Sequence, residues 1–211
     1  MLSHKPAVLL ATTPSCPYCP TMKQILQQLD QRQLLSELRI IDISQDPQLA
    51  EQYQIRSVPW LKIAELEFTG VYTPKELEYW VSHATSDEGI QLYLSQQLEN
   101  GRLAEVEKQI HTHSNWLAIA VGLLADMDAP MQARIGLSAL IEGLSDQALL
   151  KSILPNLQQY AHHTDPRVRG DACHLLGCID DESATQTLRE CANDPDPQVR
   201  EIAEDSLSLM H

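Results

Sequence analysis

Apolar residues follow two different spacings in the first 84 residues of this 211-residue chain. The short apolar run Ala7–Ala11 predicts a buried strand over about residues 6–13. A helix is predicted over residues 17–35, because apolar residues then recur at i, i+3, i+4 and i+7, as Met22, Ile25, Leu26 and Leu29. Similar patterns predict strands at about 38–44, 59–65 and 66–70 and helices at 47–54 and 74–84. Strands and helices in this mixture are typical of an α/β domain.

Strand patterns stop near residue 86, and the rest of the sequence predicts successive helices. The end of the chain repeats with a period of 31 residues. Asp165-Pro166 returns as Asp196-Pro197, and Val168-Arg169 returns as Val199-Arg200. In each copy Asp suits the N-cap and Pro the first helical position. Apolar residues follow at helical spacing in both copies, as Ala172, Leu176 and Ile179 and as Ala203, Leu207 and Met210.

A weaker copy of the repeat begins near Arg134, and second helices are expected around residues 148–157 and 184–191. Paired helices with a period of this size predict an all-α solenoid. The D-P-x-V-R start of each copy resembles HEAT repeats, most clearly over residues 128–211. The resemblance implies about three to four helix pairs, stacked so that each buries the apolar face of its neighbour.

The motif with the most specific chemistry is Cys16-Pro17-Tyr18-Cys19, which lies between the first predicted strand and the first predicted helix. Unpaired N–H groups and the helix dipole favour a thiolate at a helix N-terminus. We therefore expect an exposed Cys16 as the attacking thiolate, Pro17 at the first helical position, and Cys19 one turn into the helix as the resolving thiol. This arrangement predicts thiol–disulfide exchange.

Zinc binding is the alternative for this motif, since a C-x-x-C pair is often half of a zinc site. Such sites usually take a second pair of Cys or His ligands, and the sequence holds no second C-x-x-C. We therefore predict no metal site. Cys173, Cys178 and Cys191 are interpreted as packed helix residues. Cys173 and Cys178 are placed on one helix, at an angle that is poor for a bond between them.

The net charge of the chain limits the kinds of binding partner that we expect. The chain has 15 Lys and Arg against 29 Asp and Glu, a formal net charge of -14, and residues 85–211 hold 8 of the basic and 20 of the acidic residues. An acidic surface repels phosphate, so we expect neither nucleic acid nor a membrane as a partner. No apolar run is long enough for a signal peptide or a membrane span. We therefore expect a cytoplasmic protein, in which the cysteines indicate redox or metal chemistry at one pair rather than a disulfide framework.

Over about residues 5–84, the order of elements and the motifs resemble the thioredoxin superfamily. Cys16-Pro17-Tyr18-Cys19 is the glutaredoxin tetrapeptide, and with Pro20 it is similar to the motif of glutaredoxin-like protein disulfide oxidoreductases. Val58-Pro59 matches the family's cis-proline, and Phe68-Thr69-Gly70 matches the end of its last strand.

This resemblance implies a central four-stranded mixed sheet with flanking helices. It also implies that Pro59 turns the backbone of Val58 toward a peptide, which pairs with it as an added strand. The substrate-binding residues implied around the two sulfurs are Pro17, Tyr18, Val58 and Trp60.

Some positions depart from the glutaredoxin pattern. Thr13 stands where a Lys is usual, and Gly70 is followed by Val71 and Tyr72 instead of a second glycine. Both missing features would bind glutathione, so the resemblance does not imply a dependence on glutathione. Other departures are Ser15 in place of the thioredoxin Trp, Leu10 near the position of its buried Asp, and the bulky Trp60 after the proline, which is expected to narrow the substrate groove.

The predicted organisation is a thioredoxin-like domain at residues 1–85 and a HEAT-like helical domain at residues 86–211. We expect a thiol–disulfide oxidoreductase without a cofactor, which acts on protein disulfides and takes electrons from an upstream thiol reductant. The helical repeats are expected to dock a protein partner, and their charge favours a basic one. Two alternatives stay open: a glutathione-dependent glutaredoxin, and an adaptor or assembly scaffold whose thioredoxin-like unit is redox-gated or inert.

Overall fold

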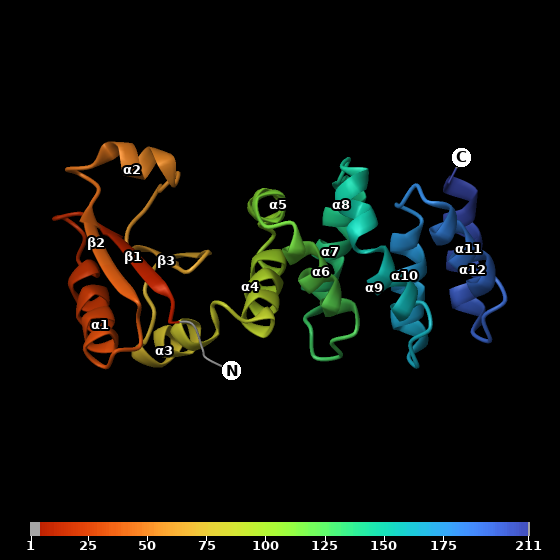
Figure 1. The fold of residues 1–211 in the computed structure, drawn as a ribbon, viewed down its shortest axis with the longest axis horizontal. Coiled ribbons are helices and arrows are strands. Elements are labelled where there is room, and N and C mark those ends of the chain that lie inside the picture. Colours follow the sequence, from red (N-terminus) through yellow and green to blue (C-terminus); the bar gives the residue numbers. More distant parts are fainter. Residues whose placement is uncertain (1–4, 211) are drawn as a thin grey trace. The chain divides into compact units, whose positions relative to one another are not determined.

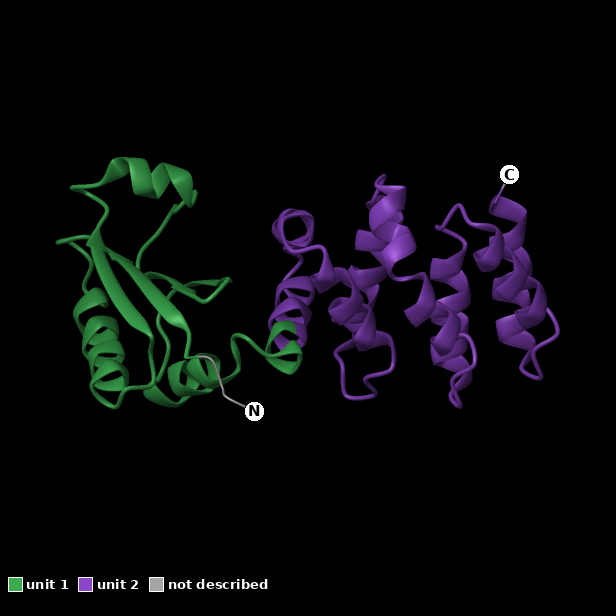
Figure 2. Cartoon of the chain, in the orientation of Figure 1, with its two compact units in different colours: residues 1–90 green, residues 91–211 purple. Residues whose placement is uncertain are grey.

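The computed structural model describes residues 5–210 and divides into two compact units, residues 1–90 and 91–211 (Figure 2). Helix α4 (Asp87–Glu99) spans the point of division. The predicted domain boundary between residues 85 and 86 lies just before this helix and stays a prediction.

A mixed sheet forms the centre of the first unit, with its strands in the order β2-β1-β3-β4 (Figure 1). β1 is parallel to β2 and antiparallel to β3, and β3 and β4 form an antiparallel hairpin. In β1, Leu10 and Ala11 are fully buried, as an uninterrupted apolar run predicts for a strand that is covered on both faces. This confirms the predicted fold class. The strands are β1 (Ala7–Thr12), β2 (Glu37–Asp42), β3 (Trp60–Ile63) and β4 (Leu66–Thr69).

Three helices accompany the sheet: α1 (Cys19–Gln31), α2 (Pro47–Gln52) and α3 (Pro74–His83). The prediction for the start of α1 is wrong, because Pro17 lies before the helix and Pro20 occupies its first turn. The helix also ends earlier than the predicted residue 35. Gln33 takes a left-handed backbone conformation, with φ of 58°, and this ends the run of helical bonds.

A capping box fixes the N-terminus of α3. The Thr73 hydroxyl accepts a hydrogen bond from the Glu76 amide at 3.3 Å, and the Glu76 carboxylate accepts one from the Thr73 amide at 2.7 Å. Replacing Thr73 with Ala is expected to lower the free energy of unfolding by about 1 kcal/mol, because the cap is lost. Urea denaturation measures this change. Lys75→Ala, an exposed change in the same turn, should leave stability unchanged, and an unaltered midpoint in the Thr73 variant would contradict the expectation.

The second unit consists of helices within its described residues, as predicted. The intervening helix expected at residues 148–157 is divided in two, because Pro155 lies in the first turn of α9 and has no N–H to continue the preceding helix. No helix among residues 5–210 has both the length and the hydropathy that a membrane span requires. After α4 come α5 (Leu103–Thr112), α6 (Asn115–Val121), the 3-10 turn η1 (Gly122–Leu124), α7 (Met131–Gly143), α8 (Gln147–Ser152), α9 (Leu154–Tyr160), α10 (Pro166–Leu176), α11 (Glu182–Cys191) and α12 (Pro197–Leu209).

The 31-residue repeat corresponds to α10 and α12, which pack against each other (Figure 1). The carboxylates of Asp165 and Asp196 accept bonds from the amide two residues later, at 2.9 and 2.8 Å. Arg169 and Arg200 both fold back and donate to the carbonyl six residues earlier, at 2.9 and 2.7 Å. The D-P-x-V-R motif therefore encodes a turn that is anchored to the helix following it.

Candidate active site

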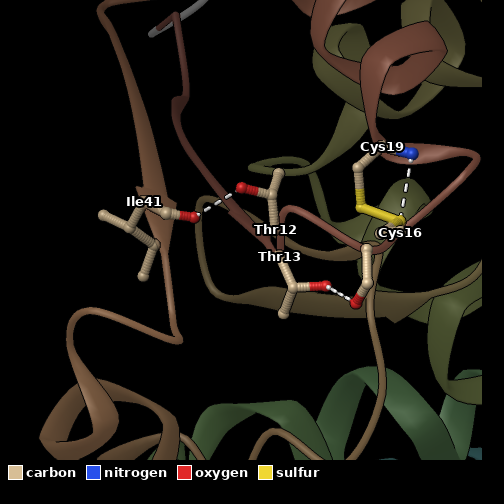
Figure 3. Close-up of a disulfide and its surroundings, with 6 residues drawn as sticks. Thr12, Thr13, Cys16, Cys19 and Ile41 are labelled. Carbon is tan, nitrogen blue, oxygen red and sulfur yellow. Dashed lines mark hydrogen bonds between the residues drawn. A yellow bond between two sulfur atoms is a disulfide. The ribbon is translucent and has the colours of Figure 1, made fainter.

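The first strand ends in a turn that carries the cysteine motif. Thr12, the last residue of β1, donates its hydroxyl hydrogen bond to the Ile41 carbonyl of β2 at 2.9 Å (Figure 3). The chain then turns, and the Cys16 amide donates to the Thr13 carbonyl at 3.2 Å. α1 begins three residues later at Cys19. The sequence thus places Cys16 in the turn and Cys19 in the first residue of the helix.

Cys16 and Cys19 form a disulfide in this structure (Figure 3). The backbone amide of Cys19 donates a hydrogen bond to the Cys16 sulfur at 3.1 Å. This amide is one of the N–H groups at a helix start that has no partner within the helix. N–H groups at a helix start favour negative charge on a nearby sulfur. The site is thus a disulfide at the junction of a turn and a helix, with a helix-start N–H directed at the Cys16 sulfur.

The disulfide lies beneath exposed neighbours. Pro17 is exposed, and 59% of the Tyr18 surface is open to solvent. The prediction of an exposed Cys16 is wrong for this oxidised form, in which 8% of Cys16 and 4% of Cys19 are exposed. The bond turns each sulfur toward the other, so each covers its partner. Both residues are therefore buried in the oxidised form.

A cis peptide bond joins Val58 to Pro59 immediately before β3. The sheet register pairs Trp60 with Ala11, one residue before the end of β1, so Pro59 lies at the sheet edge from which the cysteine turn starts. Val58 is half-buried. The predicted peptide-binding segment and the cysteine turn therefore share one edge of the sheet, while the role of Pro59 and Val58 stays a prediction.

Trp60 is part of the core. Only 4% of its surface is exposed, and its ring packs on Tyr53 with centroids 5.3 Å apart. The prediction that Trp60 narrows an open substrate groove is therefore wrong. As the first residue of β3 it lies against the Tyr53 ring, and Lys62 lies 5.6 Å from the centroid of that same ring.

The loop after β4 is a part of the site whose contacts the sequence did not predict. Gly70 has φ of +108°, a conformation that glycine adopts readily, and its amide donates to the Pro59 carbonyl at 2.9 Å. Val71 is 53% exposed, and the Tyr72 amide contacts the Met22 sulfur of α1 at 3.4 Å. The loop therefore joins the cis-proline to the first turn of the cysteine helix. In the sequence, Gly70 directly after the predicted strand was the signal from which this loop conformation could have been predicted.

The three remaining cysteines lie in the second unit. Cys173 and Cys191 are buried, as predicted for packed helix residues, whereas Cys178 is half-buried. Cys173 and Cys178 do not share a helix, contrary to the prediction, because α10 ends at Leu176. Among residues 5–210, no group of three or more His, Cys, Asp or Glu is arranged to hold a metal ion.

A mixed four-stranded sheet, a bonded C-x-x-C pair where the first helix begins, and a cis-proline at the same sheet edge define a thioredoxin-fold domain. Residues 7–105 match the profile of the Glutaredoxin-like domain (DUF836), and residues 118–208 match that of HEAT repeats. Over 75 residues, which are 35% of this chain and 88% of its relative, the sequence is 32% identical to a protein named Thioredoxin from Methanocaldococcus jannaschii. The chain belongs to the thioredoxin superfamily, with a glutaredoxin-like domain at the N-terminus followed by HEAT repeats.

These matches confirm the predicted combination of the two kinds of domain. The glutaredoxin-like match continues to residue 105 and so includes α4 and the start of α5.

Proposed function

We propose that this protein is a thiol–disulfide oxidoreductase that exchanges disulfides with protein substrates through Cys16 and Cys19. The observation that carries the proposal is the disulfide at the start of α1, with the Cys19 amide donating to the Cys16 sulfur. Cys16 is the nucleophile, because its sulfur receives this hydrogen bond. Cys19 is the resolving residue.

The reaction is two successive exchanges. The Cys16 thiolate attacks a substrate disulfide, forms a mixed disulfide and releases the first substrate thiol. Cys19 then attacks the Cys16 sulfur, which releases the second substrate thiol and leaves the Cys16–Cys19 disulfide. An upstream thiol reductant supplies the two electrons that restore both thiols. We place this cycle in the cytoplasm, where thiol reductants are abundant.

The substrate is a peptide segment that lies across the sheet edge. Exposed Pro17 and Tyr18 flank the disulfide on the side of α1, and half-buried Val58 flanks the start of β3. A cis-proline before β3 supports pairing of the Val58 backbone with an extended peptide. A protein substrate fits this end of the sheet, because its backbone can pair with that of Val58 while its disulfide sulfur contacts Cys16.

Glutathione is the less well supported electron donor. Thr13 offers a neutral hydroxyl, 3.4 Å from the Ser15 hydroxyl, in place of a cation. The loop after β4 continues as Val71 and Tyr72 in place of a second glycine. These differences favour a dithiol reductant over glutathione.

We further propose that the HEAT repeats dock a protein partner with a basic surface. Three large apolar side chains are exposed in or just before α7: Met127 at 51%, Met131 at 72% and Ile135 at 62%. Met131 and Ile135 are four residues apart and so lie on one helix face. Residues 85–211 hold 20 acidic and 8 basic residues. This excess of negative charge favours a partner of positive charge.

Trapping tests the chemistry and the docking together. A Cys19→Ser variant cannot resolve the mixed disulfide, so substrates are expected to stay bonded to Cys16 and to be released by reductant on gels. Mass spectrometry then identifies them. Adding Ile135→Lys to this variant removes an exposed apolar side chain and adds a charge that repels a basic partner, so it is expected to reduce the yield of any trapped protein that also uses the repeats.

A Cys16→Ser/Cys19→Ser variant is the control for trapping and separates the enzyme from an adaptor. It should trap nothing. A partner that binds this variant as well as the native chain, together with no trapping by Cys19→Ser, would favour the adaptor. Turnover of a glutathionylated peptide with glutathione as the only donor would instead favour a glutaredoxin.

A further inference from the structure

We propose that two copies of this chain associate through strand β2, which pairs antiparallel with β2 of the second copy. The two four-stranded sheets then continue into one sheet across a two-fold axis. The exchange reaction proposed above uses β2 in no step. This inference therefore goes beyond that function and stands or falls independently of it.

Strand β2 is an open edge of the sheet. The strand order β2-β1-β3-β4 gives β2 a neighbour on one side, which is β1 (Figure 1). Within residues 5–210 no strand pairs with the other side of β2. A row of backbone N–H and C=O groups at such an edge is a template for a further strand.

The apolar side chains of β2 are only partly covered. None of its six residues is fully buried, whereas β4, the strand at the other edge, buries Leu66 and Phe68. Leu38, Ile40 and Ile41 of β2 are half-buried. An added strand would cover more of their apolar surface, and the removal of this surface from water favours association.

The charges of β2 fit a second copy of the same strand. Glu37 and Arg39 are both exposed and, two residues apart, lie on one face of the sheet. In an antiparallel pair centred on Leu38, Glu37 of each copy lies opposite Arg39 of the other. Two-fold symmetry thus produces two ion pairs. Pairs centred on Arg39 or on Glu37 would oppose two like charges, which is destabilising. The charges therefore select both the occupant and one register.

Features that commonly prevent the pairing of sheet edges are missing from β2. Such edges are often protected by a proline, by a bulge or by charges of one sign. The sequence of β2, Glu37–Asp42, contains no proline. β2 pairs residue for residue with β1, from Ala7 with Glu37 to Thr12 with Asp42, and so has no bulge. Its two exposed charges have opposite signs.

The distribution of net charge also favours association through the first unit. Residues 85–211 hold 8 basic and 20 acidic residues, which leaves 7 basic and 9 acidic residues for residues 1–84. Repulsion between two copies is therefore concentrated in the HEAT-repeat part of the chain. The part that contains β2 is close to neutral and opposes the approach of a second copy far less.

The pairing leaves both cysteine sites open. β1 is parallel to β2, and the cysteine turn follows the end of β1. Because the two β2 strands run in opposite directions, the two cysteine turns lie at opposite ends of the joint sheet. Each copy therefore keeps its own access to substrate.

Sedimentation of the full chain, with reductant present so that no disulfide joins two copies, tests the pairing. We expect a reversible equilibrium between monomer and dimer in the micromolar range, because one strand pair is a small interface. Arg39→Glu turns both ion pairs into like-charge contacts and should raise the dissociation constant by about tenfold or more.

Two further variants make this test specific. The double variant Glu37→Arg/Arg39→Glu exchanges the two charges, restores both ion pairs and should dimerise almost as well as the native chain. Lys75→Glu makes the same change of charge at an exposed position of α3 and should leave the dissociation constant unchanged. Circular dichroism should show that all variants are folded.

A cross-link tests the register. In the proposed pair the two copies of Leu38 lie directly opposite each other, with Cα atoms about 4.5–5.5 Å apart, a distance that a disulfide spans. Leu38→Cys in the Cys16→Ser/Cys19→Ser chain should therefore give a covalent dimer under mild oxidation. Ile40→Cys in the same chain is the control, because its two copies lie too far apart along the strands. The three native free cysteines are present in both proteins.

Three results would overturn the inference: a chain that stays monomeric into the millimolar range, a dimer that Arg39→Glu does not weaken, or equal cross-linking through positions 38 and 40. Reduction of insulin per chain should be the same for the native and Arg39→Glu proteins. Lack of that activity in both would contradict the proposed function and leave the pairing through β2 intact, so the two proposals can fail separately.

Discussion

Replacing Cys16 with Ser is expected to lower the rate of disulfide reduction by about 1,000-fold or more, because only uncatalysed exchange remains without the nucleophile. The serine hydroxyl can accept the hydrogen bond that the Cys19 amide donates to the Cys16 sulfur in the native chain, but it does not ionise at neutral pH and therefore does not replace the thiolate. Reduction of insulin disulfides, followed by turbidity with dithiothreitol as donor, measures the effect.

Cys178→Ser is the matched control for this prediction, because Cys178 is a half-buried thiol of the second unit that lies outside the disulfide. It should reduce insulin at the native rate. Circular dichroism should show that both variants are folded. Native activity in the Cys16→Ser protein would end the assignment of this disulfide as the reactive group.

Replacing Asp194 with Asn is expected to lower the free energy of unfolding by about 3 kcal/mol, because it leaves a largely buried guanidinium without its counter-charge. The side chains of Arg169 and Asp194 are only 13% and 8% exposed, and Asp194 also accepts a bond from the Asp196 amide at 2.8 Å. The carboxylate therefore joins α10 to the turn before α12. Urea denaturation followed by circular dichroism measures the loss.

The exposed pair of Arg32 and Glu78 gives the comparison. Its side chains are 55% and 45% exposed, so Glu78→Gln is expected to leave stability unchanged within error. Equal losses from Glu78→Gln and Asp194→Asn would contradict the idea that burial makes the Arg169 pair strong.

Lowering the pH is expected to weaken the ion pair between Arg169 and Asp194. The hydrogen bond from Arg169 holds the pKa of Asp194 below its usual range. A carboxylate with a depressed pKa stabilises the fold fully above the pKa of the unfolded chain, about 3.9 for Asp, and this contribution is lost as pH falls below that value. Between about pH 5 and about pH 3 the native protein should therefore lose more stability than Asp194→Asn does. Parallel curves for the two proteins would assign the acid sensitivity to other groups.

Local patterns in the sequence predicted much of this architecture. The spacing of Met22, Ile25 and Leu26 located α1, because a buried helix face needs that repeat. The two D-P-x-V-R motifs located α10 and α12, because an Asp cap and a first-turn Pro start a helix by local bonds alone. The position of the cysteine pair also followed from local sequence, at the junction of a strand and a helix.

Those local patterns could not predict features that depend on contacts between residues distant in the sequence. Pro17 and Pro20 both suit a helix start, and the choice between them follows from the turn that binds the Cys16 amide to Thr13. The burial of Trp60 follows from its packing on Tyr53. The contact of Gly70 with Pro59 and the pairing of Arg169 with Asp194 likewise join segments that sequence spacing does not relate.

Arg169 and Arg200 donate hydrogen bonds to carbonyls that precede them in the chain, and these bonds affect how the number of HEAT repeats can change. Each arginine binds carbonyls of the turn that precedes its own helix, at 2.9 and 2.7 Å. A single 31-residue copy thus brings both the loop and the side chain that holds it. Duplication or deletion of one copy consequently leaves the remaining loops supported, so that evolution or an engineer can lengthen the scaffold in whole steps.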